Sequence, residues 1–421
     1  MSKSMYAPAA AVIGITGLLA LSVMLMPPMS AGKARAQQGA DDAQAKADLP
    51  AVVQGNTEFA FALYSQVRGE KGNLFLSPYS ISTALAMTSS GADGNTLSQM
   101  EKALRFPVGQ ARLHPAFGLL LKQTRSGKGY QLHVANALWC QTGVPFREDF
   151  LSINEKYYDA KPTGVDFAAS PEQARLTINA WVEKQTQEKI KDLLKPGVIS
   201  ALTRLVLTNA IYFKGDWARK FDPKQTRDEP FWLNPTTQVK VPMMRQTGEF
   251  PYLVQGDFQA LELPYAGEEI SMVILVPTKA DGLAELEKSL TTEKFHEVLK
   301  KLHPTPGLEV AVPRFKVTAE FNLNQALSNL GMIDAFDDRK ADFSRISPVA
   351  RKQGWHITAV VHKAFVEVNE EGTEAAAATG VVIGIRSLPP SFRADRPFFF
   401  LIRDKRTNSI LFMGRVVDPR S

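Results

Sequence analysis

The stretch from Val361 to Ser387 constrains the fold of this 421-residue chain more than any other. From Val361 to Asn369 apolar and polar residues nearly alternate, and this period of two predicts a β-strand. The alternation stops at Glu370–Glu371–Gly372, and small, nearly uncharged residues follow over 373–379. The glycine and proline residues beyond them are typical of a flexible, exposed segment. The sequence therefore predicts a strand that leads directly into an exposed loop.

Two structures are compatible with residues 373–379. The composition Thr-Glu-Ala-Ala-Ala-Ala has high helix propensity, so the segment could form a short surface helix. As a strand, the same segment would place alternate side chains on opposite faces. One face would carry Thr373, Ala375, Ala377, Thr379, Val381 and Ile383, and the other would begin with Glu374. The first face has no charge, so the segment could enter a sheet without burying an unpaired charge, which costs several kcal/mol.

The segment from Glu370 to Thr379 resembles the hinge of the reactive loop in inhibitory serpins. The hinge residues that this resemblance implies are Gly372, Thr373, Glu374, Ala375, Ala376, Ala377, Ala378 and Thr379. In serpins the residue that enters the protease pocket lies fourteen positions after the hinge glycine, so the implied reactive bond is Arg386–Ser387. The segment Asp395–Leu401 resembles the serpin segment that resumes the fold after the loop, and its spacing implies the same bond. Arg393, the alternative arginine, lies seven residues farther along.

Further motifs extend the resemblance over nearly all of residues 50–421. They are Asn73–Ser82 with Gly91–Ala92, Thr208–Trp217, Leu330–Met332 with Ala341–Ser344, and Leu411–Val416. The resemblance implies an α+β serpin fold, in which helices pack on a large central mixed sheet with further smaller sheets. It also implies a single domain over residues 51–421, with an exposed reactive-centre loop at about 370–395.

Serpins carry a polar cluster beneath the strands that part when the loop enters the sheet. By resemblance this cluster would consist of Ser77, Ser80, Asn209 and His362, and insertion would start at Trp217 and Glu370. A buried polar cluster is tolerated when its members hydrogen-bond to one another, and such a network can hold two strands together. From the residues alone, His362 could instead be an ordinary buried histidine of the core.

The chain places helical patterns first and strand patterns later, an order typical of an α+β protein. Ser77–Pro78 predicts the start of a helix that ends before Gly91, Thr96 with Gln99 predicts a capping box, and Ser170–Gln173 predicts the start of a longer helix. The run Leu205–Phe213 is apolar on both faces, which predicts the central strand of a covered sheet. Other predicted strands are Val239–Met244, Phe258–Leu263, Ile270–Val276, Leu308–Val317, His356–Asn369, Phe398–Arg403 and Ser409–Val417.

The N-terminus has the features of a secretory signal. Lys3 precedes an apolar run from Ala9 to Met26, and Ala34–Arg35–Ala36 matches an A-x-A cleavage site. We expect residues 1–36 to be removed and the mature protein to be secreted, periplasmic or extracellular. The apolar run is nearly long enough to span a bilayer, so a retained membrane anchor is the alternative. Residues 37–50 are polar and alanine-rich, and they predict a disordered leader.

Charge and motifs argue against other functions. Removing residues 1–36 lowers the formal net charge from +6 to +3, which is too small to indicate nucleic-acid binding. The sequence has no H-E-x-x-H, G-x-S-x-G or P-loop motif, so we expect no enzyme, no metal and no cofactor.

The single cysteine, Cys140, cannot form an intrachain disulfide, and its apolar surroundings predict a buried strand position. Lys122, Arg125 and Lys128 could mark a polyanion site, although charges at a helix end are commonly just solvated.

The resemblance implies a suicide-substrate inhibitor of serine proteases. The positive charge of Arg386 suits the acidic primary pocket of trypsin-like proteases, which would form a covalent complex with a monomeric inhibitor. The alternative is a serpin that does not inhibit and acts as a carrier, a chaperone or a plain protease substrate. The hinges of such members commonly carry bulky, charged or proline residues, and Ala375–Ala378 do not. Glycine weakens a strand, so Gly380 and Gly384 would slow insertion. A larger fraction of the inhibitor molecules would then be cleaved without trapping the protease.

Overall fold

The computed structural model describes residues 31–125, 127, 129–160, 163–372 and 389–421. Residues 42–421 form one compact unit, and the described part of the other unit, residues 31–41, is helical. Most of the predicted secretory signal lies outside the described residues, as do Thr373–Thr379, Arg386 and Ser387. Within the described ranges, no helix combines the length and the apolar character needed to cross a membrane.

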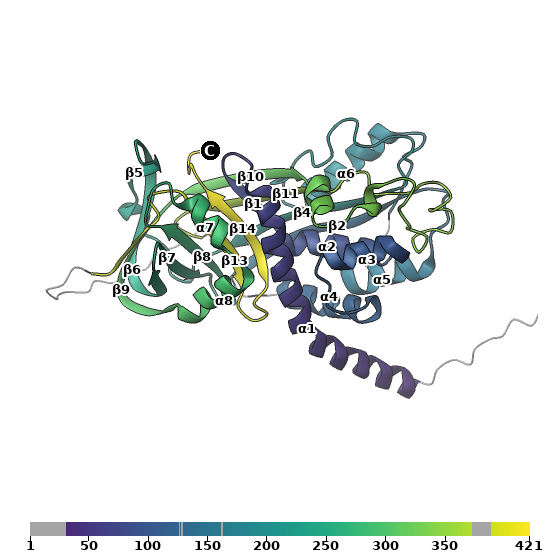
Figure 1. Ribbon diagram of the computed structural model, residues 1–421, viewed down its shortest axis with the longest axis horizontal. Coiled ribbons are helices and arrows are strands. Elements are labelled where there is room, and N and C mark those ends of the chain that lie inside the picture. The colour runs from purple at the N-terminus through teal and green to yellow at the C-terminus, as the bar shows by residue number, and fades with distance from the viewer. Residues whose placement is uncertain (1–30, 126, 128, 161–162, 373–388) are drawn as a thin grey trace, which may run out of the picture. The chain divides into compact units, whose positions relative to one another are not determined.

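The first helix, α1, runs from Ala31 to Val67 (Figure 1). The predicted disordered leader over 37–50 is therefore wrong, because α1 covers it. The alanines of this stretch favour a helix, and tertiary packing fixes its later part. Ala45 is buried, and Asp48 accepts a hydrogen bond from Arg112 Nε at 2.9 Å. Since Arg112 lies 64 residues away in the chain, local composition could not reveal this anchor.

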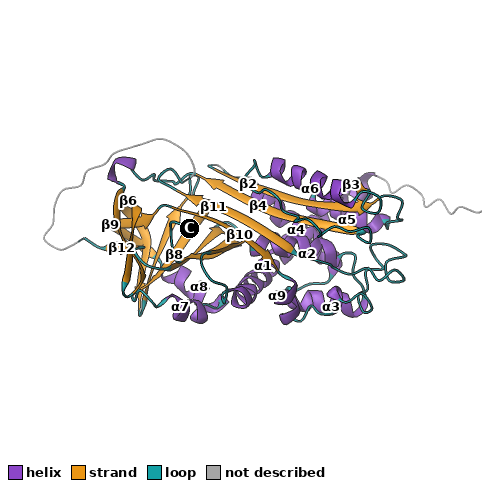
Figure 2. Cartoon of the chain, turned by 90° about the horizontal axis from the view of Figure 1, so that it is seen from above, coloured by secondary structure: helices purple, strands orange, loops and turns teal. Residues whose placement is uncertain are grey.

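One sheet has five strands in the order β10-β11-β4-β2-β3. Its strands are β2 (Tyr130–Gln141), β3 (Thr163–Val165), β4 (Leu205–Gly215), β10 (Phe315–Asn322) and β11 (Val361–Val368). Strand β4 is central, as its apolar sequence predicted, and it pairs β2 in antiparallel and β11 in parallel orientation. Helix α6 (Pro171–Gln185) covers one face of this sheet and α2 (Pro78–Ser89) packs against the other (Figure 2). Cys140, on β2, is buried as predicted.

The second sheet has nine strands in the order β1-β14-β13-β8-β7-β6-β9-β12, with β5 paired to β6. Its strands are β1 (Leu74–Leu76), β5 (Arg227–Asn234), β6 (Thr237–Gln255), β7 (Phe258–Pro264), β8 (Ile270–Pro277), β9 (His303–Pro313), β12 (Ser391–Arg393), β13 (Phe398–Asp404) and β14 (Ile410–Val416). The predicted single strand Leu308–Val317 is wrong, because it is split between β9 and β10, which belong to different sheets. Pro313 has no N–H to continue the ladder, and Arg314 N bonds to Pro242 O at 2.9 Å instead.

Further α-helices lie among the described residues. They are α3 (Gly94–Ala103), α4 (Gln110–Arg125), α5 (Glu148–Tyr158), α7 (Leu283–Ser289), α8 (Thr292–Lys301) and α9 (Asn324–Asn329). Ser77 caps α2 as predicted, because its Oγ accepts a hydrogen bond from Ser80 N at 3.1 Å.

The predicted capping box of Thr96 and Gln99 is wrong. The N-cap of α3 is Asp93, and Thr96 and Gln99 lie inside the helix. Thr96 Oγ1 accepts a hydrogen bond from Asp342 N at 2.9 Å, and Gln99 Oε1 accepts one from Asp334 N at 2.7 Å. These side chains therefore hold a distant segment of chain rather than the end of their own helix.

Candidate functional site

Strands β4 and β11 meet along a short junction, which we call the β4–β11 seam. Their parallel pairing joins Lys363 with Ala210, Ala364 with Ile211 and Phe365 with Tyr212. The ladders on either side are longer: β2 and β4 pair from Tyr130 and Gly215 to Cys140 and Leu205, and β10 and β11 pair from Phe315 and Val368 to Asn322 and Val361. A seam of three residue pairs leaves strand edges in the middle of the sheet that an added strand could pair with.

A buried polar cluster crosses this seam. Ser77 N donates to His362 Nε2 at 3.0 Å, and Asn209 Nδ2 donates to Ser80 O at 2.8 Å. The other ring nitrogen, His362 Nδ1, lies 3.1 Å from Asn209 Oδ1. Because Nε2 accepts a hydrogen bond, the neutral ring carries its proton on Nδ1 and donates it to Asn209. The structure thus brings together the four residues that the family resemblance implied for one cluster, from β4, β11 and the start of α2.

His362 is fully buried, and this sets its protonation state. Burial lowers the pKa of His362 to about 3, so the ring is neutral near pH 7. The cluster requires a neutral ring, because a protonated Nε2 could not accept the Ser77 N–H. Ser77 Oγ also donates to Leu411 O of β14 at 2.6 Å. The cluster therefore ties the two sheets to the start of α2.

Trp217 holds the chain where it leaves β11. Its backbone N–H donates to Glu371 O at 3.0 Å, and its indole Nε1 donates to Asn369 O at 2.9 Å. The indole stacks on Tyr265, with ring centroids 4.5 Å apart. The start of the loop is therefore fixed at the C-terminal ends of β4 and β11.

Glu370 is a buried carboxylate in the same place. Arg314 Nε donates to its two oxygens at 2.7 and 2.8 Å, and Thr226 Oγ1 donates to it as well. Burial by itself would raise the pKa of Glu370, but the hydrogen bonds from Arg314 and Thr226 outweigh burial and hold this pKa below its usual value. The sequence identified Glu370 and missed both of its partners. The only sequence signal was Pro313, which interrupts the strand pattern just before Arg314.

Gly372 is the predicted hinge residue that falls within the described chain. Its backbone is left-handed, with φ +91°. A Cβ at this position would lie 2.3 Å from Trp217 N and 2.5 Å from Gly215 O. Both the backbone angle and the close approach to the end of β4 therefore require glycine.

Beyond the loop the chain rejoins the nine-stranded sheet. Pro390 O accepts a hydrogen bond from Glu309 N at 2.9 Å, and β12 then pairs with β9. Arg393, the alternative to Arg386, forms an ion pair with Glu229 in which Nη2 and Oε2 are 2.6 Å apart. The charge of Arg393 is thus engaged within the sheet.

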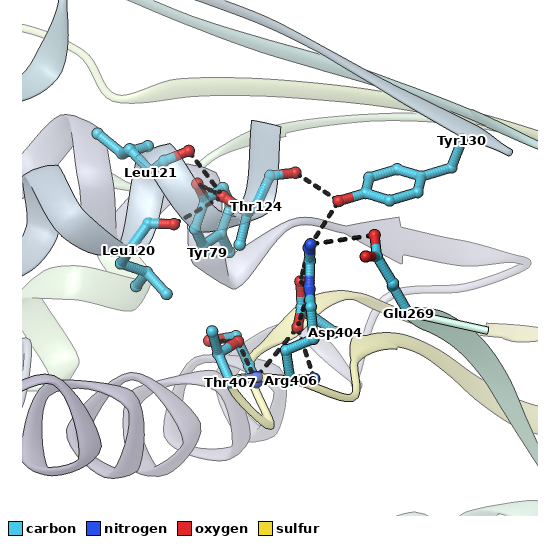
Figure 3. A network of polar contacts seen from close by, with 10 residues as sticks. Tyr79, Leu120, Leu121, Thr124, Tyr130, Glu269, Asp404, Arg406 and Thr407 are labelled. Carbon is cyan, nitrogen blue, oxygen red and sulfur yellow. Dashed lines mark hydrogen bonds and ion pairs between the residues drawn. The ribbon is translucent and has the colours of Figure 1, made fainter. Parts of the chain in front are cut away.

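A second polar network fastens the start of β2 (Figure 3). The hydroxyl of Tyr130 donates to Thr124 O at 2.9 Å and accepts from Arg406 Nη2 at 2.8 Å. Arg406 also pairs with Glu269 at 3.0 Å and with the fully buried Asp404. The network joins the turn between β13 and β14 to the end of α4 and to β2. It therefore anchors the start of β2, the strand that pairs with β4.

Two other sequence-based expectations concern ions. In the part of the chain that the structure describes, no cluster of histidine, cysteine and carboxylate side chains could hold a metal ion. Arg125, at the candidate polyanion site, forms an ion pair with Asp159 at 2.9 Å, and Lys128 lies outside the described residues.

Known proteins share this architecture. Residues 54–419 match a family model described as serpin (serine protease inhibitor). The chain is 44% identical over 377 residues to leukocyte elastase inhibitor of Bos taurus, across 86% of this chain and 98% of the relative. It is 41% identical over 379 residues to antithrombin-III of Mus musculus, across 87% of this chain and 81% of the relative. Among solved structures, uncleaved ovalbumin is similar with a TM-score of 0.79 and 30% identity, across 88% of this chain and 100% of that chain.

This chain belongs to the serpin family. The family predicted from the hinge and the further motifs is confirmed, and so is the α+β serpin fold.

Proposed function

We propose that this chain inhibits serine proteases of the trypsin-like class by trapping the acyl-enzyme while its cleaved loop enters the β4–β11 seam. The observation that carries the proposal is the seam itself, where three residue pairs join two strands that long ladders hold to their other neighbours. The two parts of the sheet can therefore separate as units. The relatives named leukocyte elastase inhibitor and antithrombin-III support a protease as the partner.

The proposed reaction begins at Arg386, whose guanidinium enters the acidic primary pocket of the protease. The serine Oγ of the protease attacks the Arg386 carbonyl carbon. The bond from this carbon to Ser387 N breaks, and the catalytic histidine transfers the serine proton to the released amine. The product is an ester between the protease serine and Arg386, which water would normally hydrolyse.

Insertion competes with this hydrolysis. Starting at Gly372, the uncharged face of the hinge enters the seam without burying an unpaired charge. A strand of about 14 residues spans roughly 45 Å at about 3.3 Å per residue. The attached protease would be carried along the sheet by this distance, and its active site would be distorted. The new central strand releases free energy stored in the native fold, which implies a metastable native state.

The polar groups at the seam have distinct roles in this proposal. Asn209 and His362 lie on opposite sides of the seam, so their hydrogen bond must break or rearrange when a strand enters between them. Trp217 and Glu370 hold the loop entry closed until the loop is cut. The native contacts thus keep the uncut chain from inserting its own loop.

We also propose that residues 1–36 direct secretion and that the inhibitor domain, residues 51–421, acts as a monomer outside the cytoplasm. The signature of Ala34–Arg35–Ala36 supports cleavage before Gln37. N-terminal sequencing of the exported protein should begin at Gln37, and an intact Met1 on a membrane-bound product would show a retained anchor instead.

The test of the main proposal mixes the full chain with trypsin and analyses the products by denaturing gel electrophoresis and mass spectrometry. We expect a complex that survives denaturant and a released C-terminal peptide that begins at Ser387. Clean cleavage after Arg386 with fully active trypsin would show a substrate rather than an inhibitor. Trapping with cleavage at another bond would refute the assigned bond.

Two matched variants separate insertion from cleavage. Ala377→Glu places a carboxylate on the face that would enter the sheet, whereas Ala376→Glu places the same charge on the opposite face. We expect trypsin to cleave Ala377→Glu without being trapped and to form the complex with Ala376→Glu. Equal trapping by the two variants would contradict the assignment of faces.

A further inference from the structure

A cavity of about 520 Å³ lies at the N-terminal ends of β4 and β11. Leu205, Val206 and Leu207 of β4 line it, together with Val361 at the start of β11. The seam pairs residues only from Ala210 and Lys363 onward. The cavity therefore occupies the part of the seam where the two strands are not paired. Its volume falls in the range of about 300–1,000 Å³ that is typical of small-molecule sites.

The walls of this cavity come from both faces of the five-stranded sheet. Leu193 and Ile199, from the segment after α6, belong to apolar clusters on the α6 face. Phe343 and Ile346 belong to the main core cluster on the α2 face. The cavity therefore reaches both faces of the sheet where β4 and β11 begin and are not yet paired.

At this cavity, apolar side chains of β4 are only partly covered. Leu205, Val206 and Leu207 are half-buried, whereas residues 208–213 of β4 are nearly all fully covered. The central strand of a sheet covered on both faces should be buried along its whole length. A ligand with an apolar body would cover this surface, which is favourable in proportion to the area removed from water.

Arg204 supplies a positive charge at the cavity wall. Its Nη1 donates to Ala201 O at 2.8 Å and to Thr203 O at 2.9 Å, which fixes the guanidinium. Its Nε and Nη2 have no hydrogen-bond partner among the residues that the structure describes. Two neighbouring N–H groups of a guanidinium match a carboxylate or sulfonate. The lining also contains one carboxylate, Asp338, so an anionic group would lie at Arg204.

We propose that this cavity binds a small amphipathic molecule, with its apolar body between β4 and β11 and a carboxylate or sulfonate head on Arg204. Binding itself needs only the native structure. Its consequence rests on the proposed function, because the bound molecule occupies the stretch of the seam that the inserted loop would fill last. A ligand that binds only the native form stabilises that form by mass action. It therefore slows insertion and converts part of the inhibitor into substrate.

Binding is tested by titrating the full chain with anilinonaphthalene sulfonate, which has apolar rings and one sulfonate, and following the dye fluorescence. We expect one saturable site per chain. Arg204→Gln should weaken binding about tenfold, because it removes the charge from the hydrogen bond to the sulfonate. Ala359→Trp should abolish binding, because Ala359 lines the cavity and a tryptophan ring would fill it.

Ala284→Trp is the matched control, since Ala284 is an exposed alanine on α7 outside the cavity lining. It should bind the dye as the wild-type chain does. Dye binding by Ala359→Trp at wild-type affinity would overturn the proposal. If Ala359→Trp does not fold, wild-type affinity in Arg204→Gln overturns it in the same way.

A second measurement links the cavity to inhibition. Saturating dye should raise the fraction of wild-type molecules that trypsin cleaves without forming a covalent complex. It should have no such effect on the Ala359→Trp variant. Equal effects on both chains would refute the link to insertion. If the wild-type chain without dye forms no covalent complex, the proposed function fails while the dye titration still decides the binding site.

Discussion

Replacing Gly372 by alanine tests how tightly the entry of the loop is held. The residue has φ +91°, and an added Cβ would meet the backbone of Trp217 and Gly215 at 2.3 and 2.5 Å. Gly256 offers a matched control, because it also has a positive φ, +59°, but has no atom within 4 Å of an added Cβ. The two substitutions share the cost of the backbone angle and differ in the clash.

The expected magnitude follows from these two terms. An alanine in the left-handed region costs about 1–2 kcal/mol, and Gly256→Ala should show only this cost. At Gly372 the clash must push Trp217 away, which weakens its hydrogen bonds to Glu371 and Asn369. Each of these bonds contributes about 1 kcal/mol net to stability. We therefore expect Gly372→Ala to lose about 3 kcal/mol of unfolding free energy.

Thermal unfolding followed by circular dichroism at one fixed scan rate measures the difference. For a compact unit that spans residues 42–421, an unfolding entropy of about 2.1 cal/mol/K per residue gives a shift of roughly 1.3 °C per kcal/mol. The midpoint should fall by about 4 °C for Gly372→Ala and by about 2 °C for Gly256→Ala. Equal shifts of the two midpoints would refute the reasoning, because they would show that the close approach of Gly215 and Trp217 to Gly372 adds no cost.

Three further predictions concern buried groups. The pKa of His362 is lowered to about 3, whereas an unfolded histidine titrates near about 6.5. The contribution of neutral His362 to the unfolding free energy is therefore complete above about pH 6.5 and is lost as pH falls towards 3. Urea unfolding should show a loss of about 2 kcal/mol between pH 7 and pH 5. Glu370→Gln should lower the unfolding free energy by about 1–2 kcal/mol. The expected loss is kept small because solvent screens the half-exposed partner Arg314. Burial raises the pKa of Cys140 to about 12, so the native chain should not react with a thiol reagent at pH 8.

Each of these has its own control. The chain with His362→Gln should lose about 2 kcal/mol less than the wild-type chain over the same pH interval, and an unchanged pH dependence would contradict the assignment. The stabilising effect of the Glu370 carboxylate should disappear as pH falls through its lowered pKa, so Glu370→Gln and wild type should converge in acid. Cys140 should react fully in denaturant, and fast reaction in the native state would show that β2 opens.

Local signals were sufficient for several elements. The run Leu205–Phe213 is apolar on both faces, and it forms the central strand β4. Ser77 before Pro78 predicted a cap, and Ser77 does cap α2. Local signals failed where a distant partner decides the structure. The later part of the helix over residues 37–50 is held by the contact of Asp48 with Arg112, and Thr96 bonds to a segment far along the chain.

The polar cluster at the seam required more than local patterns. Ser77 and His362 lie 285 residues apart, so only the family resemblance could place them together. The resemblance did not identify Arg314, because its contact with Glu370 depends on the gap between β9 and β10. The strand conformation of the hinge and the Arg386–Ser387 bond lie outside the described residues and stay predictions.

The position of the last strands has a consequence for biosynthesis. Strands β13 and β14 lie between β1 and β8, and Leu411 completes the cluster at Ser77. A ribosome makes β13 and β14 after β1 and β8, so a nascent chain has no partner for β1 and lacks one acceptor of the cluster until these two strands have been synthesised. Contacts between such distant parts of a sequence also form slowly. The nine-stranded sheet and its link to Ser77 therefore cannot be completed before β14 has been synthesised.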